Sequence, residues 1–129
     1  MIVRSRAPLR LGLAGGGTDV SPFSDQHGGY VMNVTIDKFA YATLDPAPSG
    51  RAEFHALDAA SVEVLEPALV DIGAGPQQLM RGVYLRISDQ LLGYRPPIRV
   101  RAYSDAPPGS GLGSSSTMVV ALVTAFAEY

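Results

Sequence analysis

The sequence contains no cysteine. Neither a disulfide framework nor a metal site built from thiolates is therefore available to it. It also lacks a large charge imbalance, because its formal net charge is −2 and its basic residues are scattered along the chain. A surface that binds nucleic acid non-specifically is normally strongly basic, so we expect no nucleic-acid partner.

Long apolar runs are missing as well. No stretch approaches the roughly 20 apolar residues of a membrane-spanning helix, and Met1–Arg10 carries arginines without the apolar core of a signal peptide. We therefore expect a cytoplasmic protein with no membrane partner. The hydrophobic fraction of 47% is ordinary for a globular protein, and 129 residues are enough for one domain with a real core.

The chain opens on a strand pattern at 2–14. Leu9, Leu11 and Leu13 alternate there with other residues, which predicts a strand with these three leucines on one buried face. The stretch 21–29 is polar and ends in two glycines, so it predicts a loop.

Two further strand patterns cover 30–44 and 51–66. The first is dense in β-branched and aromatic residues and predicts one long strand, or two strands with a bulge near Asp37. The second alternates weakly, with Val62 and Val64 on the predicted inner face, and favours a hairpin.

Helical spacing appears only later in the chain. One predicted helix begins at Pro76, with an apolar stripe that reaches Leu91, and a second helix ends the chain. One strand, 98–103, lies between them. This order predicts an α+β domain, with a mostly antiparallel sheet that two helices cover on one face.

A Gly/Ser-rich loop joins the strand at 98–103 to the closing helix. Gly109, Gly111 and Gly113 let its backbone turn tightly and approach a ligand without a Cβ in the way. The helix that follows offers N–H groups without intrahelical partners, and the hydroxyls of 114–116 can bind an oxyanion or Mg²⁺. These features predict a phosphate site. Because no lysine follows the glycines, the additional positive charge must come from a metal ion or an arginine.

A flexible linker, or a serine that only caps the helix, is the alternative for this loop. A second glycine-rich stretch, Gly15 to Asp19, follows the first strand. Its glycines permit close approach either to a ligand or to another strand, and the carboxylate of Asp19 suits paired sugar hydroxyls. An ordinary turn in which Asp19 caps the next segment is equally compatible with the pattern.

Together the two stretches resemble a known family. Ala7–Asp19 resembles the first motif of the GHMP kinase superfamily, and Pro107–Ser116 closely resembles its second, ATP-binding motif. Within the superfamily, Gly-Gly-Gly-Thr-Asp and the run 28–41 are most similar to the heptose 7-phosphate kinases, whereas galactokinases carry Gly-Glu-His-Thr-Asp at that place. The resemblance implies the ribosomal protein S5 domain 2-like fold.

It also implies an activity and its ligands. The implied reaction transfers the ATP γ-phosphate to the anomeric hydroxyl of D-glycero-D-manno-heptose 7-phosphate, on the way to nucleotide-activated heptose. ATP and Mg²⁺ are the implied cofactors, and the sugar phosphate is the other small-molecule ligand. A homo-oligomer is compatible with the sequence.

The resemblance assigns roles to individual residues. Arg10 corresponds to the arginine near the transferred phosphate, and Ser115, with Ser114 as the second choice, corresponds to the Mg²⁺ ligand. On its residues alone, Arg10 has the alternative of pairing with a carboxylate. The implied sugar-binding residues are Gly16, Gly17, Thr18 and Asp19. The implied ATP-binding residues are Pro108, Gly109, Ser110, Gly111, Leu112, Gly113, Ser114 and Ser115.

The family's acidic metal ligand, its candidate base and its third glycine-rich motif come from sequence that follows the second motif. We therefore expect residues 1–129 to form a single N-terminal domain that lacks the C-terminal domain and is inactive alone. Two alternatives stay open: another GHMP sugar 1-kinase, of the fucose, arabinose or galactose type, and a non-catalytic nucleotide-binding module.

Overall fold

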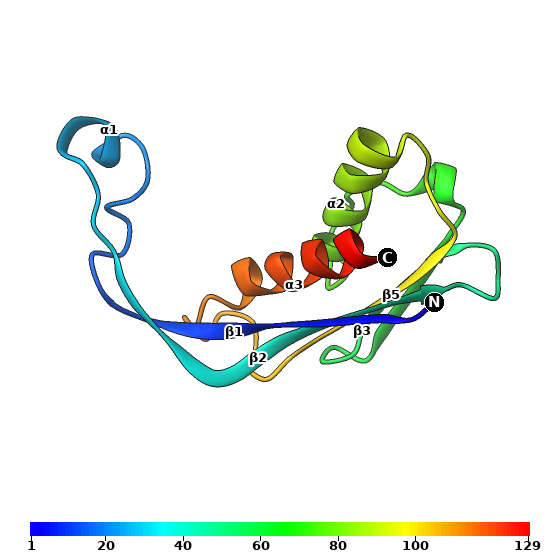
Figure 1. Cartoon of the computed structure of the whole chain (residues 1–129), viewed down its shortest axis with the longest axis horizontal. Helices are drawn as coiled ribbons and strands as arrows, with labels where there is room; N and C mark the ends of the chain where they lie inside the picture. Colours follow the sequence, from blue (N-terminus) through cyan, green and yellow to red (C-terminus); the bar gives the residue numbers. More distant parts are fainter.

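The computed structural model describes all residues from Met1 to Tyr129. One five-stranded sheet has the order β1-β2-β5-β3-β4, and two helices lie on one of its faces (Figure 1). The strands are β1 (Val3–Ala14), β2 (Met32–Pro46), β3 (Ala52–Ala56), β4 (Ser61–Leu65) and β5 (Ile98–Ser104). The helices are α1 (Phe23–His27), α2 (Gln78–Ile87) and α3 (Ser114–Glu128), with a 3₁₀ turn η1 (Pro67–Leu69) and a π-helical turn η2 (Ser88–Leu92).

The sheet is mixed but mainly antiparallel. β5 runs parallel to β3, whereas β1–β2, β2–β5 and β3–β4 are antiparallel pairs. The predicted α+β architecture, with two helices on one face, is therefore confirmed. No helix is long and apolar enough to span a membrane.

Small side chains bring α3 close to the sheet. Ala121 and Ala125 of α3 are fully buried, as are Ala40 and Ala42 of β2, so little more than methyl groups separates helix and strand. The Ser5 hydroxyl of β1 also donates a hydrogen bond to the Ala121 carbonyl. These contacts fix the position of α3, and therefore of its first turn, relative to β1 and β2.

Under α2 the core is aromatic. The rings of Phe54 and Tyr84 meet edge to face with centroids 5.5 Å apart, and both side chains are fully buried. The Tyr84 hydroxyl donates to the Pro96 carbonyl at 3.0 Å. Burial raises the pKa of Tyr84 to about 12, so this hydroxyl stays a donor at physiological pH.

A bulge interrupts the β1–β2 ladder. Pro8 pairs with Phe39 and Arg10 pairs with Thr35, so three residues of β2 lie opposite Leu9 alone. The long strand predicted at 30–44 is therefore a single strand with a bulge at the predicted place. Beyond the bulge the two strands continue as a ribbon that curves toward the helix side of the sheet and carries α1 at its tip (Figure 1).

The leucine face of β1 was predicted incorrectly in part. Leu9 is fully buried, but Leu11 and Leu13 are 43% and 59% exposed. They lie on the ribbon beyond the bulge, where neither α2 nor α3 covers the sheet (Figure 1). The predicted loop at 21–29 was also wrong in part, because its middle forms the short helix α1.

The inner face predicted for β4 was wrong. Val62 and Val64 are exposed, while Glu63, between them, faces α2 and pairs with the buried guanidinium of Arg81, with Nη1 2.8 Å from its Oε2. Arg81 is only 4% exposed and needs a carboxylate beside it, which selects this register over the one that would bury the valines.

The first predicted helix is shorter than expected. α2 begins at Gln78 rather than Pro76 and ends at Ile87, after which η2 has the wider π-helical turn. Met80, Val83, Tyr84 and Ile87 are buried as predicted, but the changed periodicity turns Leu91 outward, where it is 77% exposed.

The face of the sheet opposite the helices carries an ionic network. Arg99 donates to Glu53 at 2.6 Å and Arg101 donates to Asp45 at 2.7 Å. The hydrogen bond from Arg99 is the main reason that the pKa of Glu53 falls to about 2. These strands are thus fixed from both faces.

Candidate functional site

The loop that leads from β5 to α3 is anchored at its start. The carboxylate of Asp105 accepts a hydrogen bond from the backbone N–H of Phe39 at 2.9 Å and one from the Tyr41 hydroxyl at 3.4 Å. Burial is the main cause of a raised pKa at Tyr41, and the nearby Asp105 carboxylate raises this pKa further. The Tyr41 hydroxyl therefore remains a donor. The loop therefore leaves the sheet at a fixed point beside the bulge of β2.

The glycines of this loop surround a small hollow. Gly109, Gly111 and Gly113 have φ values of 78°, 76° and 70°, which side-chain-bearing residues rarely adopt. A Cβ on Gly109 or Gly111 would meet nothing within 4 Å. The three glycines and the first residues of α3, Ser114–Ser116, line a cavity of about 200 Å³.

The first turn of α3 leaves its N–H groups available to this hollow. Gly113 precedes the helix without a side-chain cap, and the first intrahelical bond runs from the N–H of Thr117 to the Gly113 carbonyl at 3.0 Å. The N–H groups of Ser114–Ser116 therefore have no partner within the helix. Together with the positive end of the helix dipole, these N–H groups give the hollow the features that favour a bound anion.

Arg10 lies directly against the glycine loop. Its backbone N–H donates to the Leu112 carbonyl at 3.1 Å, and its Cγ and Nε would each lie 3.2 Å from a Cβ on Gly113. Its Nη1 donates to Oδ1 of Asn33 at 2.6 Å. Arg10 takes part in no ion pair, so the alternative that it pairs with a carboxylate is wrong. A guanidinium without a counter-ion thus lies beside the hollow that the three glycines line.

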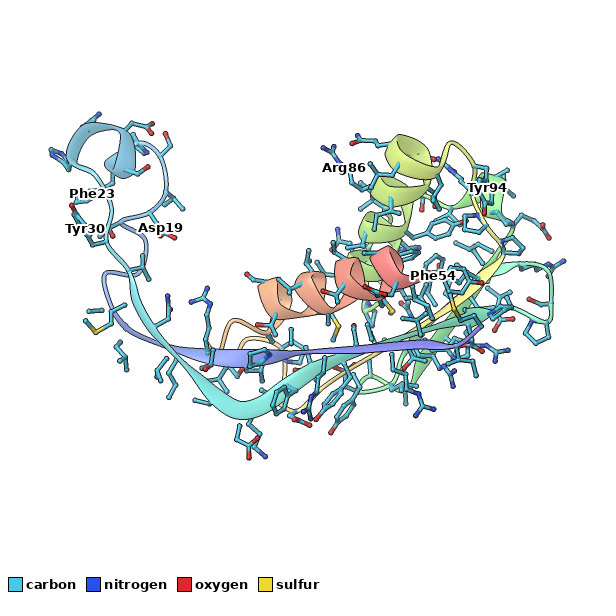
Figure 2. The ribbon with its side chains drawn as sticks, viewed as in Figure 1. Asp19, Phe23, Tyr30, Phe54, Arg86 and Tyr94 are labelled. Carbon is cyan, nitrogen blue, oxygen red and sulfur yellow. The ribbon has the colours of Figure 1, made fainter.

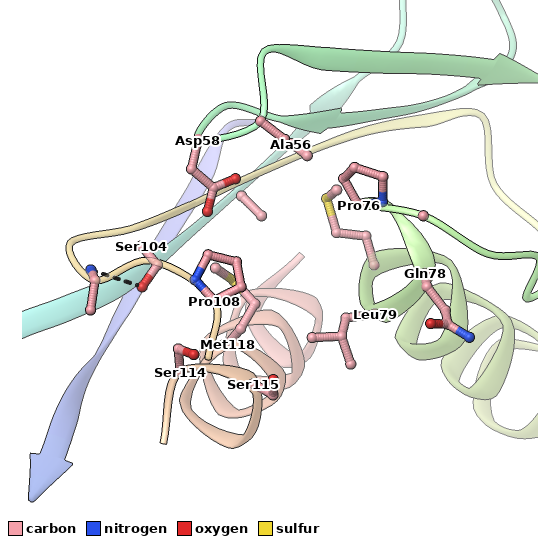
Figure 3. Close-up of a pocket in the computed structure, with 15 residues that line it drawn as sticks. Ala56, Asp58, Pro76, Gln78, Leu79, Ser104, Pro108, Ser114, Ser115 and Met118 are labelled. Atoms are coloured by element: carbon pink, nitrogen blue, oxygen red, sulfur yellow. Dashed lines mark hydrogen bonds between the residues drawn. The ribbon is translucent and has the colours of Figure 1, made fainter. Parts of the chain in front are cut away.

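A larger cleft of about 530 Å³ adjoins the hollow (Figure 3). Ser114 and Ser115 line both cavities, so the two adjoin at the start of α3. The rest of the lining comes from the β3–β4 turn, from the segment that enters α2 and from β5. It is mostly small or apolar, with the carboxylate of Asp58 and the amide of Gln78 as larger polar groups (Figure 3).

Sequence reasoning missed this cleft. Its lining consists largely of alanine, proline and methionine drawn from four separate segments, and none of these types signals chemistry by itself. The one available signal was Asp58, an acidic residue in a turn between two strands of a hairpin, which is a common surface position.

The tip of the β1–β2 ribbon holds the other glycine-rich stretch. A Cβ on Gly15 would overlap the Tyr30 carbonyl, and one on Gly29 would overlap the Thr18 carbonyl, so these glycines let the two sides of the tip touch. The Thr18 hydroxyl donates to the Gly15 carbonyl at 2.7 Å and accepts from the N–H of Tyr30 at 3.1 Å. Thr18 therefore organises the tip loop.

Gly16, Gly17 and Asp19 remain open to solvent. A Cβ on either glycine would meet nothing within 4 Å. The Asp19 carboxylate makes no hydrogen bond within the chain, and α1 begins without a side-chain cap, so Asp19 does not act as its cap. Figure 2 shows Asp19 on the ribbon tip, which rises on the same side of the sheet as the helices. The structure does not bring Asp19 into contact with the glycine loop.

Three serine hydroxyls line the hollow and could bind a divalent cation, among them the predicted ligand Ser115. Ser115 lines the hollow and offers a hard oxygen, the donor type that Mg²⁺ prefers. No group of three or more histidine, cysteine or acidic side chains converges anywhere in the chain. A Mg²⁺ ion at Ser115 would therefore take most of its ligands from bound phosphates and water.

Comparison with known proteins points to one family. The model of the GHMP kinases N terminal domain matches residues 78–129. The D-glycero-alpha-D-manno-heptose 7-phosphate kinase of Campylobacter jejuni is 39% identical over 127 residues, which cover 98% of this chain and 38% of that protein. Residues 78–129 thus match the N-terminal domain of the GHMP kinases, and nearly the whole chain is similar to a heptose phosphate kinase. The glycine loop and the start of α3 fall inside the segment that the family model matches.

A solved relative shares the fold over nearly the whole chain. The crystal structure of a D-glycero-D-manno-heptose 1-phosphate kinase from Bacteroides thetaiotaomicron superposes with a TM-score of 0.86 at 45% identity, and covers 99% of this chain and 42% of that one. An L-fucokinase/L-fucose-1-P guanylyltransferase of Bacteroides fragilis is 25% identical over 150 residues and is matched over only 16% of its length. The chain thus spans about two-fifths of the length of the heptose phosphate kinases that it resembles.

Proposed function

We propose that the protein is an ATP-dependent sugar-phosphate kinase, and that this chain supplies its nucleotide-binding domain. One observation carries the proposal: a hollow lined by glycines and free helix N–H groups adjoins an apolar cleft and has Arg10, without a counter-ion, beside it. The two adjoining cavities match the two halves of a nucleotide, one polyanionic and one largely neutral. The relatives, which are about two and a half times as long, support a second domain in the whole protein.

In this arrangement the ATP phosphates occupy the hollow, and the nucleoside occupies the cleft. The N–H of Ser110 donates to the Pro107 carbonyl at 3.2 Å, so the other backbone N–H groups of 109–115 hold the phosphate oxygens. They do so at low cost, because they are already oriented before ATP binds. Mg²⁺ completes the site by neutralising phosphate charge, with the Ser115 hydroxyl, or that of Ser114, as a protein ligand. The cytoplasm supplies these ligands.

The acceptor sugar binds toward the ribbon tip. Asp19 accepts hydrogen bonds from sugar hydroxyls, Gly16 and Gly17 leave room for the sugar, and Thr18 holds the loop in shape. Phosphoryl transfer depends chiefly on positioning and on neutralising charge at the transferred oxygens. Arg10 supplies that neutralisation, because its guanidinium binds phosphate oxygens and keeps its charge.

We further propose D-glycero-D-manno-heptose 7-phosphate as the acceptor, with transfer to its anomeric hydroxyl. The named relatives support a heptose phosphate but differ, since one is called a 7-phosphate kinase and the other a 1-phosphate kinase. Both reactions would give the same heptose 1,7-bisphosphate, so the product alone cannot separate them.

The test supplies the product of the complete gene with Mg·ATP and, separately, heptose 7-phosphate, heptose 1-phosphate, or free fucose, arabinose and galactose. ADP release and ³¹P NMR of the product identify the acceptor. Turnover with heptose 7-phosphate, and a new anomeric phosphate resonance, is the expected result. Turnover only with heptose 1-phosphate would refute the acceptor assignment, and turnover only with a free sugar would refute the sugar-phosphate class.

A further inference from the structure

We propose that Asn33 is a positioning residue for Arg10: its amide holds the guanidinium beside the glycine loop while leaving the positive charge available to a bound anion. This inference rests on the proposed function, because it concerns the site at which phosphate is held. It adds a residue on β2, outside both glycine-rich stretches, to that site.

The geometry explains how Asn33 reaches Arg10. Asn33 pairs with Gly12 across the β1–β2 ladder, and Arg10 lies two residues before Gly12 on the same face of β1. The Asn33 amide lies over Gly12, with Oδ1 3.8 Å from the place of a Cβ, which is an ordinary contact distance. Oδ1 then accepts the hydrogen bond from Nη1 of Arg10 at 2.6 Å.

The glycine loop holds Arg10 from the other side. The backbone N–H of Arg10 donates to the Leu112 carbonyl, and the side chain packs against Gly113 at the entry to α3. Arg10 is exposed, so its long side chain would otherwise sample many rotamers. The Asn33 amide and Gly113 together restrict it to a position next to the hollow.

The type of partner distinguishes Arg10 from the structural arginines of this protein. Arg81 pairs with Glu63, Arg95 with Asp89, and Arg99 with Glu53, so a carboxylate neutralises each of these charges. Asn33 orients Arg10 without neutralising it, because an amide oxygen accepts a hydrogen bond but carries no net charge. The guanidinium retains its other N–H donors and its full charge for phosphate oxygens.

Two substitutions of Asn33 separate positioning from structure. Both are measured in the product of the complete gene, by Mg·ATP binding in calorimetry and by steady-state kinetics. Asn33→Ala removes the acceptor, and Asn33→Asp keeps the acceptor but adds a negative charge. We expect Asn33→Ala to weaken Mg·ATP binding about tenfold, since it removes the orientation of one charged hydrogen-bonding group. We expect Asn33→Asp to weaken it at least as much, because the carboxylate would neutralise Arg10.

A purely structural role predicts the opposite result for the aspartate. It would preserve or strengthen the bond to Arg10, so Mg·ATP binding close to that of the unsubstituted protein in Asn33→Asp would overturn the proposal. Thr35→Ala is the matched control, because Thr35 is exposed on the same strand and pairs with Arg10 through the backbone alone. Thermal unfolding of each variant shows whether the fold is intact.

A double-mutant cycle tests whether Asn33 acts through Arg10. If it does, Asn33→Ala causes no further loss of Mg·ATP affinity in a protein that already carries Arg10→Ala. An undiminished loss in that background would also overturn the proposal. If the unsubstituted protein binds Mg·ATP but phosphorylates no sugar or sugar phosphate, the proposed function fails, and the binding cycle still decides the role of Asn33.

Discussion

A Cβ placed on Gly15 would overlap the Tyr30 carbonyl, whereas a Cβ placed on Gly111 would meet nothing within 4 Å. Both residues have φ near 75°, and both follow a strand that leads into a short glycine-rich turn. At the ribbon tip the missing side chain therefore lets two parts of the chain touch. In the loop before α3 it leaves a hollow that faces solvent.

This difference shows that a run of glycines does not by itself mark a ligand site. The surroundings of the glycine decide: a backbone carbonyl lies against Gly15, whereas Gly111 lines a hollow with free helix N–H groups and, at Gly113, an arginine without a counter-ion. Substitutions at the two turns should therefore separate loss of ligand binding from loss of local stability.

The largest effect is expected from removal of the Arg10 guanidinium beside the hollow. Arg10→Ala should lower kcat of the complete gene product about 10³-fold, because an arginine at the transferred phosphoryl group contributes on this scale. Steady-state ADP release measures it. Arg86→Ala is the control, because Arg86 is exposed on α2, away from the ribbon (Figure 2). A change of less than tenfold in Arg10→Ala would place Arg10 outside the reaction.

The next largest effect is expected when a methyl group is added beside the hollow. Gly111→Ala should weaken Mg·ATP binding about 30-fold, because the Cβ displaces a phosphate oxygen from one or two charge-assisted hydrogen bonds. Calorimetric titration measures this affinity. The substitution should also lower the free energy of unfolding by about 1 kcal/mol, because alanine must adopt the left-handed backbone conformation of Gly111. Unchanged affinity would mean that the phosphates do not enter the hollow.

The same change at the ribbon tip should have the reverse signature. Gly15→Ala should destabilise the tip by about 2 kcal/mol, because the backbone must move to relieve the overlap with Tyr30. Hydrogen exchange should accelerate in 14–31, while Mg·ATP affinity stays within a factor of two. A large loss of nucleotide affinity would show that the two turns form a single site.

The smallest effect concerns the hydroxyl that organises the tip. Thr18→Val keeps the shape of the side chain but removes its bonds to Gly15 and Tyr30, at a cost of about 1 kcal/mol in local stability. The substitution should raise KM for the sugar phosphate more than KM for ATP, because Asp19, the proposed sugar ligand, directly follows Thr18 in the sequence. Thr18→Ser, which keeps the hydroxyl, serves as the control. Equal changes in both KM values would contradict a role for the tip in sugar binding.

Local patterns predicted the parts of the structure that depend on local chemistry. The glycine loop, the start of α3 and the bulge near Asp37 all follow from the preferences of residues close in sequence. Arg10 was predicted from the motif resemblance. The structure places it against Gly113, which hydrophobic periodicity could not have predicted because the two residues are far apart in the sequence. The roles of Asp19 and Ser115 remain predictions.

Features that depend on distant packing could not be read from the sequence. Leu11 and Leu13 alternate like buried residues, but burial requires a covering helix, and α3 does not reach that part of the ribbon. Val62 and Val64 are exposed because a buried arginine on another element, Arg81, requires Glu63 on the inner face. The 530 Å³ cleft has the same origin, since four segments meet there only in the folded chain.

The strand order has a consequence for folding. β5 is the last strand in the sequence but the middle one in the sheet, inserted between β2 and β3. A nascent chain that ends before Ile98 therefore has only two separate hairpins with unpaired edges, which are prone to aggregate. When β5 inserts, it joins them and carries the glycine loop, attached to its end, into place beside Arg10. We therefore expect completion of the sheet and assembly of the hollow to coincide, so that partly folded forms of this domain have no affinity for phosphate.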